Sequence, residues 1–324
     1  MSAADVSAVI INGLSYALPL FIIAVGGIYS ERSGITNLAL EGTLGFGAFA
    51  GGLFVVVLGS RFAAGSAAPL YLSFLFAAAG GGLYAALHAL LCVGFQANQV
   101  ISGVAVNILS AALTGFLTNQ INVTVFGSPS NKFMVGVSPR VTVPVVSGIP
   151  VIGAVFTDVY PFEIIILALA AVCWYVLYRT RYGLRLRACG DCPQAVAAAG
   201  ADVSGTRFLA VVISGALSGV GGMCFAYSVT ANFSSSLYFG AGYLAIAALI
   251  FGNWRILPTF GACILFGFAR SAARQMVKLL EISSNVTDLA MSIPYLLTLL
   301  LLAFFAKGSR APRALGEIYD QSKR

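Results

Sequence analysis

Long apolar runs separated by short polar stretches dominate this chain of 324 residues. Runs of about 20 apolar residues are long enough to cross the hydrocarbon core of a bilayer as helices. They are far longer than the roughly 10-residue alternating segments of an outer-membrane barrel. The pattern predicts nine transmembrane helices, at about residues 7–29, 43–60, 67–94, 100–122, 162–178, 207–230, 237–253, 257–275 and 293–306.

The polar interruptions add detail to this pattern. Residues 123–161 are rich in Pro and Gly and contain β-branched runs, which predicts an extracytoplasmic excursion with some extended structure. Residues 276–292 form a second, smaller excursion.

The segment 31–42 (ERSGITNLALEG) is too polar for a lipid-facing helix and too apolar for an ordinary loop. It predicts a broken or re-entrant helix inside the protein. If that segment crosses the membrane, there are ten spans rather than nine, and the N-terminus lies inside rather than outside.

Composition supports the same fold class. The chain is 59% hydrophobic and 9% charged, whereas soluble domains carry about 25% charged residues. Only helices and closed barrels can span lipid. The sequence therefore predicts an all-α, polytopic integral membrane protein with about 9–10 transmembrane helices, in which residues 1–324 form a single transmembrane domain. The first apolar run lacks a positively charged leader and a cleavage site, so we expect it to be retained as a span.

The positive charge of the chain is concentrated in two places. Ten of the 18 Lys and Arg residues fall in segments 179–207 and 307–324. Cytoplasmic loops of membrane proteins carry such an excess, so we expect residues 179–206 to form a cytoplasmic loop and residues 307–324 a cytoplasmic tail. The even number of spans between them agrees with this. No basic patch is interleaved with aromatic residues, so the net charge of +7 does not predict nucleic-acid binding.

The cytoplasmic loop contains a short predicted helix. After four arginines (Arg179, Arg181, Arg185 and Arg187), which we interpret as topological and lipid-contacting, the chain reads ACGDCPQAVAAAG. Pro193 suits the first helical turn, Asp191 suits the N-cap, and Gly200 suits the stop. The result is a small-faced helix on the cytoplasmic surface that could fit a groove on a partner protein. A plain connector without a partner is the alternative.

The residue types needed for chemistry are scarce. No P-loop pattern occurs, and the single histidine, His88, lies in an apolar run. Cys189 and Cys192 have the spacing of a zinc or redox pair, but zinc would need two further ligands. The sequence therefore predicts no catalytic residue, metal site or cofactor. A secondary transporter would need acids midway along the spans, and a membrane-embedded enzyme would need clustered His, Asp or Glu; neither pattern is present.

Polar residues near or within the spans are candidates for a transport pathway, because charge inside a membrane is costly and usually functional. A local ion pair among Glu31, Arg32 and Glu41 is one explanation of those charges. Neutral Asn side chains suit sugar hydroxyls or bases, although hydrogen bonding between helices explains them equally well. The pathway candidates are Glu31, Asn37, Glu41, Asn98, Asn107 and Asn119.

Three basic residues, Arg270, Arg274 and Lys278, are spaced four apart and share one helix face. The predicted topology places them at the outer end of a span, against the positive-inside trend. They could dock an acidic lobe of a binding protein, or extend to lipid phosphates.

Four segments together resemble the membrane permeases of ATP-binding-cassette (ABC) importers of the ribose/branched-chain type, in particular the nucleoside and simple-sugar subgroup. These are the segment 31–52, ANQVISGVAVNIL (97–109), RACGDCPQAVAAAG (187–200) and FGAGYLAIAALIFGNWRILP (239–258), and the tail RAPRALG (310–316) is also typical. Their order and spacing carry the resemblance. One departure is Asp191 and Cys192, where the family usually has Glu and a residue other than Cys.

The resemblance implies the function and the partners. The chain would be one permease subunit in a bacterial inner membrane, importing nucleosides, or alternatively riboflavin or a simple sugar. Separate ATPase subunits, a second permease that is identical or different, and an extracytoplasmic substrate-binding protein would complete the importer. Residues 187–200 match the family's coupling loop, which implies ATPase coupling by Gly190, Asp191, Pro193, Gln194, Ala195, Ala198 and Gly200.

Overall fold

The structure is a computed structural model that describes residues 3–63, 66–136, 138–142, 158–235, 240–279, 292, 296 and 310–320. Its helices are α1 (Ala3–Arg32), α2 (Leu40–Leu58), α3 (Ala68–Ala89), α4 (Gln99–Phe126), α5 (Pro161–Arg179), α6 (Arg181–Asp191), α7 (Pro193–Ala198), α8 (Val203–Phe225), α9 (Ala241–Phe251) and α10 (Ile256–Leu279). A 3₁₀ turn follows α2 (η1, Gly59–Arg61), and π-helical turns follow α3 (η2, Leu90–Gly94) and α8 (η4, Ala226–Thr230). Two short strands, β1 (Lys132–Met134) and β2 (Asn232–Ser234), pair antiparallel. Within the described ranges, seven helices are long and apolar enough to cross a membrane. This confirms the predicted all-α polytopic membrane fold.

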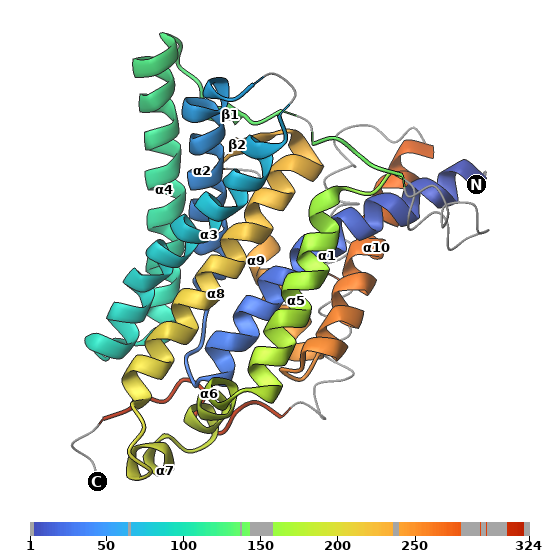
Figure 1. Ribbon diagram of the computed structural model, residues 1–324. Coiled ribbons are helices and arrows are strands. Elements are labelled where there is room, and N and C mark those ends of the chain that lie inside the picture. Colours follow the sequence, from blue (N-terminus) through green and yellow to red (C-terminus); the bar gives the residue numbers. More distant parts are fainter. Residues whose placement is uncertain are drawn as a thin grey trace.

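Helix α8 lies at the centre of the bundle and packs along α1, α2 and α3 (Figure 1). Glycines allow these backbones to approach one another closely. A Cβ on Gly219 would collide with the carbonyl of Ala77, and a Cβ on Gly81 would collide with the carbonyl of Gly215. In lipid, helices associate through such close packing at small residues. Glycines on both helices therefore allow α3 and α8 to pack closely.

Helix α4 stands at the edge of the bundle and is the least buried of the seven long helices (Figure 1). Its exposed face carries large apolar side chains, among them Ile101, Ile108 and Phe116. In a membrane, such a face contacts lipid tails or another membrane helix.

Two segments interrupt the helical pattern. Residues 33–39 form turns and irregular backbone between α1 and α2, so the helical structure is broken within 31–42, as predicted. The predicted span 237–253 needs a correction, because α9 covers only 11 residues, or about 17 Å. It begins after Gly240, whose φ of +99° lies in the left-handed region that favours glycine. A helix of this length does not cross the hydrocarbon core alone.

The two ends of the molecule gather different segments. Helices α6 and α7, the end of α1 and the C-terminal tail (residues 310–320) lie at one end, and the N-terminus and the end of α10 lie at the other (Figure 1). At the first end, the backbone N–H of Ala314 donates to the carbonyl of Gly190 over 2.8 Å. At the other, Gln275 Nε2 donates to Asp5 Oδ1 over 3.0 Å. If α6 is cytoplasmic, as the sequence predicts, α1 starts on the outer side, as in the nine-span alternative.

Several sequence predictions concern parts of the chain outside the described residues. These are the span 293–306 apart from Leu296, the segment 143–157 of the first excursion, and residues 280–291 of the second. The described part of the first excursion contains β1 and an isolated bridge between Val141 and Val159. Extended structure is thus present there.

Candidate functional site

A pocket of about 410 Å³ lies where α2, α4 and α9 meet. We call it the central pocket, and its lining residues are Glu41, Gly42, Gly45, Asn107, Ile108, Ser110, Ala111, Ala112, Thr114, Ser235 and Tyr243. Two helices begin beside it, α2 at Leu40 and α9 at Ala241. The first N–H groups of a helix have no partner within that helix. The pocket therefore lies where two sets of backbone donors need acceptors.

The carboxylate of Glu41 supplies acceptors for one of these sets. Its Oε1 accepts from the N–H of Gly240 over 2.8 Å, and its Oε2 accepts from the N–H of Gly242 over 2.6 Å. Glu41 also lies in the first turn of α2. Negative charge is stabilised at helix N-termini. Glu41 thus fills the anion-binding position that the start of α9 would otherwise offer.

Asn107 connects the three helices of the central pocket. Its Oδ1 accepts from the N–H of Gly42 over 2.7 Å, while its Nδ2 donates to the carbonyl of Leu38 over 2.7 Å and to the Tyr243 hydroxyl over 3.0 Å. Both amide hydrogens are used in these bonds. Because the Tyr243 oxygen accepts from Asn107, its own hydroxyl hydrogen remains available. Tyr243 is 45% exposed, so its ring and hydroxyl can contact a bound molecule.

The structure brings only two of the six predicted pathway residues, Glu41 and Asn107, into this pocket. Asn37 is buried and donates to Ser214 Oγ over 2.8 Å. Asn98 caps α4 by accepting from two backbone N–H groups. Asn119 lies nearer the other end of α4 and donates to Asn131 over 3.0 Å. These three side chains make hydrogen bonds within the protein.

Sequence reasoning missed Tyr243 and Ser110 as pocket residues. Tyr243 lies within the segment 239–258, which carried part of the family resemblance. Tyr243 lies two residues after Ala241, the first residue of α9, and side chains in the first turn of a helix that begins inside a membrane lie near polar groups. Ser110 follows Asn107 by three residues and therefore lies on the same face of α4.

The predicted ion pair among Glu31, Arg32 and Glu41 is wrong. Glu31 is 3% exposed and its carboxylate accepts from the indole N–H of Trp254. Arg32 Nε donates to the backbone carbonyl of Trp254 over 2.9 Å. Both residues thus hold the turn between α9 and α10, and Glu41 binds the start of α9. The indole and the backbone donors satisfy these carboxylates in place of the guanidinium.

The cytoplasmic loop of the prediction contains two helices. The short helix was predicted correctly: α7 begins at Pro193 and ends before Gly200, whose φ is +78°. The N–H of Gly200 donates to the carbonyl of Ala197, and the next N–H donates to the carbonyl of Val196. This is the Schellman arrangement of a helix end. The N-cap prediction is wrong, because Cys192 occupies that position and Asp191 is the last residue of α6.

Helix α6 was not predicted. The hydroxyl of Thr180 caps its start by accepting from the N–H of Gly183, and its buried residues are Gly183, Leu186, Cys189 and Gly190. Their spacing of three or four is that of an amphipathic helix. The arginines between them obscured this pattern in the sequence.

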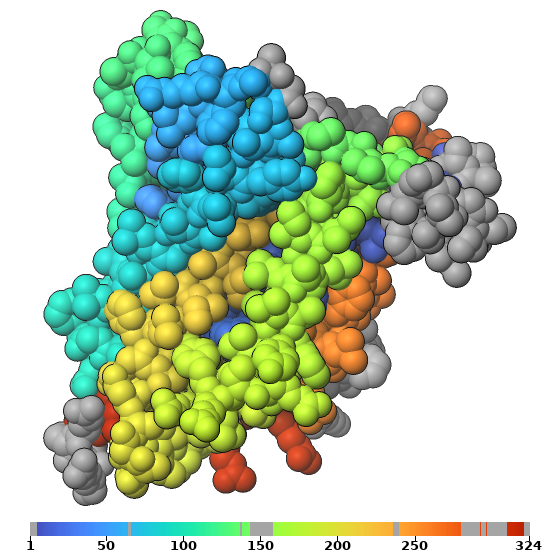
Figure 2. Space-filling view, viewed as in Figure 1, coloured from blue at the N-terminus to red at the C-terminus, as the bar shows by residue number. Residues whose placement is uncertain are grey.

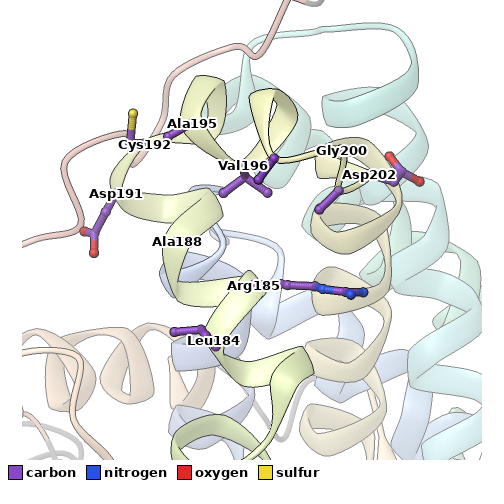
Figure 3. A pocket seen from close by; sticks show the side chains of 11 residues that line it. Leu184, Arg185, Ala188, Asp191, Cys192, Ala195, Val196, Gly200 and Asp202 are labelled. Atoms are coloured by element: carbon purple, nitrogen blue, oxygen red, sulfur yellow. The ribbon is translucent and has the colours of Figure 1, made fainter.

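Helices α6 and α7 enclose a groove of about 650 Å³ at the surface (Figure 3). We call it the α6–α7 groove, and it is lined by Leu184, Arg185, Ala188, Asp191, Cys192, Ala195, Val196, Ala199, Gly200, Ala201 and Asp202. Its wall is mainly apolar, and the charged side chains of Arg185, Asp191 and Asp202 surround it. Of the predicted coupling residues, Asp191, Ala195 and Gly200 line the groove, and Gly190 and Pro193 are buried beside it.

Cys189 and Cys192 are both free, and they differ in exposure. Cys189 is buried against Val196 and Val203, whereas Cys192 is exposed. Burial raises the pKa of the Cys189 thiol, so the reactive thiolate is disfavoured. Among the residues that the structure describes, no group of three or more His, Cys, Asp or Glu side chains could hold a metal ion.

The three basic residues of α10 do not share one environment. The guanidinium of Arg270 lies over the ring of Tyr16, 4.3 Å from its centroid, and donates to its hydroxyl over 2.7 Å. Arg274 and Lys278 are exposed. They lie in the last two turns of α10, which ends on the side of the molecule opposite α6 and α7 (Figure 1). Two of the three residues are therefore available at that surface.

The structure is a bundle of helices long enough to span a membrane, with a polar pocket beside interrupted helices and surface helices at one end. This is the architecture of a transport permease. The family model described as "Branched-chain amino acid transport system / permease component" matches residues 9–302. The chain is 38% identical, over 96% of both chains, to the guanosine ABC transporter permease protein NupQ of Bacillus subtilis. It is 37% identical, over 97% of both chains, to the nucleoside ABC transporter permease protein NupC of Lactococcus lactis.

A more distant relative is the putative glucose ABC transporter permease protein TsgC13 of Haloferax volcanii, 31% identical over 78% of this chain and 72% of that protein. No solved structure matches the chain. The chain belongs to the family of branched-chain amino acid transport system permease components. It is a permease subunit of an ABC transporter, a multi-pass membrane protein and a transport component rather than an enzyme. The predicted family resemblance is confirmed.

Proposed function

We propose that this permease imports a nucleoside across a bacterial inner membrane and that the central pocket forms part of its path. The observation that supports this class of cargo is the set of hydrogen-bond donors that Glu41 binds. Its carboxylate occupies the N–H groups at the start of α9, and none of the described residues that line the pocket is Lys or Arg. An amino acid would bring a carboxylate that needs a cation or a free helix N-terminus. The pocket therefore suits a neutral polar cargo.

Tyr243 supports a nucleoside among neutral cargoes. Its half-exposed ring offers an aromatic face, and bases stack on aromatic side chains. Its free hydroxyl hydrogen and the Ser235 hydroxyl that lines the pocket can bond the ribose or the base. Two relatives with the highest identities given above are named for guanosine and nucleoside transport. A simple sugar or riboflavin would use the same groups, and these cargoes are outcomes of the test below.

The α6–α7 groove is the proposed docking surface for the ATPase. Its mainly apolar wall fits a nonpolar side chain from a partner, and the surrounding charges of both signs fit a polar rim. Gln194 and Ala198 are exposed on α7 and would contribute to the same surface. The ATPase partner would hydrolyse ATP.

At the opposite end, Arg274 and Lys278 would receive a substrate-binding protein. The exposed apolar face of α4 would contact a second permease subunit or lipid.

The cargo is tested with the complete importer in membrane vesicles. We expect ATP-dependent uptake of labelled guanosine, with unlabelled nucleosides competing and leucine failing to compete. Equal competition by glucose or riboflavin would reassign the cargo within the neutral class. Competition by leucine would contradict the reasoning from Glu41.

The pocket is tested with a matched pair of substitutions on one helix. Asn107→Ala removes the bonds to Gly42, Leu38 and Tyr243, and we expect uptake to fall by about tenfold or more, because several buried polar groups lose partners. Asn119→Ala removes one exposed bond to Asn131 and should leave uptake close to that of the unmodified protein. An equal effect of the two substitutions would contradict the assignment of the pocket.

A further inference from the structure

Arg207 joins three segments that are distant in the sequence. It lies in the second turn of α8, is 2% exposed, and its guanidinium donates three hydrogen bonds to backbone carbonyls. Nε donates to Ser33 over 3.0 Å, Nη1 to Glu317 over 3.0 Å and Nη2 to Cys189 over 3.2 Å. One side chain thus connects the start of segment 33–39, the C-terminal tail and helix α6.

Burying the charge of Arg207 costs free energy unless these hydrogen bonds compensate for it. A buried charge requires compensation by hydrogen bonds, and a cation near a helix N-terminus is opposed by the helix dipole. The planar guanidinium compensates by directing donors in several fixed directions, which a lysine ammonium on its flexible stem does not reproduce. The three hydrogen bonds therefore depend on the planar guanidinium of an arginine.

Close backbone contacts surround the guanidinium. The N–H of Ala314 donates to the carbonyl of Gly190 over 2.8 Å, and the N–H of Gly316 donates to the carbonyl of Gly34 over 3.0 Å. A Cβ at Gly190 would collide with the carbonyl of Arg32, and a Cβ at Gly34 would come within 2.5 Å of Arg207 Nη2. The backbone of α6 is therefore in close contact with residues 32–34. The segments are packed to move together.

Segment 33–39 then leads to the central pocket through further fixed points. The N–H of Thr36 donates to Gln99 Oε1 over 2.7 Å, and Asn37 bonds both Ser214 and the N–H of Ala39. Helix α2 begins at the next residue, and Glu41 follows directly. A displacement of α6 therefore has a continuous packed and hydrogen-bonded route to the acceptor at the start of α9.

We propose that Arg207 is a positioning residue that transmits movement of α6 and α7 through residues 33–39 to Glu41 and the central pocket. This proposal rests on the proposed ATPase docking at the α6–α7 groove. It assigns to Arg207 a role in coupling and none in contact with cargo. The C-terminal tail contributes through the carbonyl of Glu317 and through its bonds to Gly190 and Gly34.

The test reports on the pocket without depending on the cargo. Ala112 is exposed and lines the central pocket, so Ala112→Cys provides a labelling site. Cys192 is the exposed native cysteine, and the protein without Ala112→Cys measures its background labelling. The complete importer in vesicles is labelled with a thiol reagent with and without ATP. We expect ATP to change the labelling rate in this background, and we expect that change to fall about tenfold in Arg207→Met and about threefold in Arg207→Lys.

Matched variants separate coupling from folding. Arg255→Met replaces an exposed arginine between α9 and α10 and should keep the response. Deletion of residues 310–324 removes the tail bonds but keeps those of Arg207 to Ser33 and Cys189, so it should give an intermediate loss. The ATPase should copurify with every variant. A full ATP response in Arg207→Met would overturn the proposal, and so would loss of copurification in both Arg207 variants, because Arg207 would then only maintain the docking surface.

The result also separates the two proposals. Failure of guanosine uptake with an intact ATP-dependent labelling response would reject the cargo and leave the role of Arg207 standing. Absence of any ATP response in the Ala112→Cys background with unmodified Arg207 would reject ATPase coupling to this pocket and the role of Arg207 together.

Discussion

Cations at the two ends of this permease have different partners. At the end that holds α6 and α7, Arg32 and Arg207 point into the protein and donate to backbone carbonyls. At the opposite end, Arg274 and Lys278 are exposed (Figure 1). The space-filling view shows parts of the C-terminal tail, in red, projecting at the same end of the molecule as α6 and α7 (Figure 2). Arg32 and Arg207 thus fix segments of the protein itself, whereas Arg274 and Lys278 face outward.

This difference predicts two kinds of response to substitution. Charges bonded inside a packed cluster are little affected by salt, and their loss disturbs the position of neighbouring segments. Exposed charges act on partners at a distance, and their effect decreases as salt increases. Substitutions inside the packed cluster should therefore have the larger effects, and those effects should not depend on ionic strength.

The largest effect is expected from Gly190→Leu. The new side chain would meet the carbonyl of Arg32 and the N–H of Gly34, and overpacking of this kind costs about 1–3 kcal/mol. We expect a lower thermal unfolding temperature of the purified permease and loss of transport. Gly261→Leu is the control, because an added Cβ at Gly261 meets nothing within 4 Å. Equal stability of the two variants would contradict the close packing at Gly190.

Local signals in the sequence were sufficient for much of the fold. Apolar runs gave the long spans, and Pro193 and Gly200 gave both ends of α7. Helix α6 was missed because its apolar residues alternate with arginines that were interpreted as topological. The shortness of α9 was also missed, because its apolar run continues through Gly240, where the structure has a left-handed turn.

The sites were less predictable, because they depend on contacts between distant parts of the chain. Asn98 and Asn107 are both on or beside α4, yet one caps the helix and the other joins three helices at the pocket. Nothing in their local sequence separates these roles. Arg207 bonds to the carbonyl of Ser33, 174 residues away. A bond to a backbone carbonyl leaves no residue-type signal at the partner position, so sequence patterns do not reveal it.

An intermediate effect is expected at the outward-facing end. The double substitution Arg274→Glu and Lys278→Glu should weaken docking of the substrate-binding protein by about tenfold at low salt, because charge complementarity mainly accelerates association. Arg270 is left unchanged, since it packs on Tyr16 and its loss would disturb α1. The measurement is the association rate of the binding protein with the permease in vesicles over a range of salt concentrations.

The salt dependence distinguishes docking from contact with lipid. Charges are screened over about 10 Å at 0.1 M salt, so association with the unmodified permease should slow as salt increases, and the difference between the two proteins should shrink. Association that is insensitive to salt and to the double substitution would leave Arg274 and Lys278 as contacts to lipid phosphates.

The smallest effect is expected from Asp191→Lys. Asp191 is exposed at the end of α6, lines the α6–α7 groove and precedes the start of α7 by two residues. The substitution reverses charge beside a helix N-terminus, where negative charge is favoured, but exposed charges contribute only about 0.2–1 kcal/mol each. We therefore expect ATPase binding to weaken by about threefold to fivefold, with unchanged membrane insertion and unfolding temperature. Because Asp191 faces solvent rather than the Arg207 cluster, the loss should diminish in high salt, unlike that of Gly190→Leu. A loss of ATPase binding that persists in high salt would place Asp191 with the packed cluster and contradict the distinction between the groove and the segments behind it.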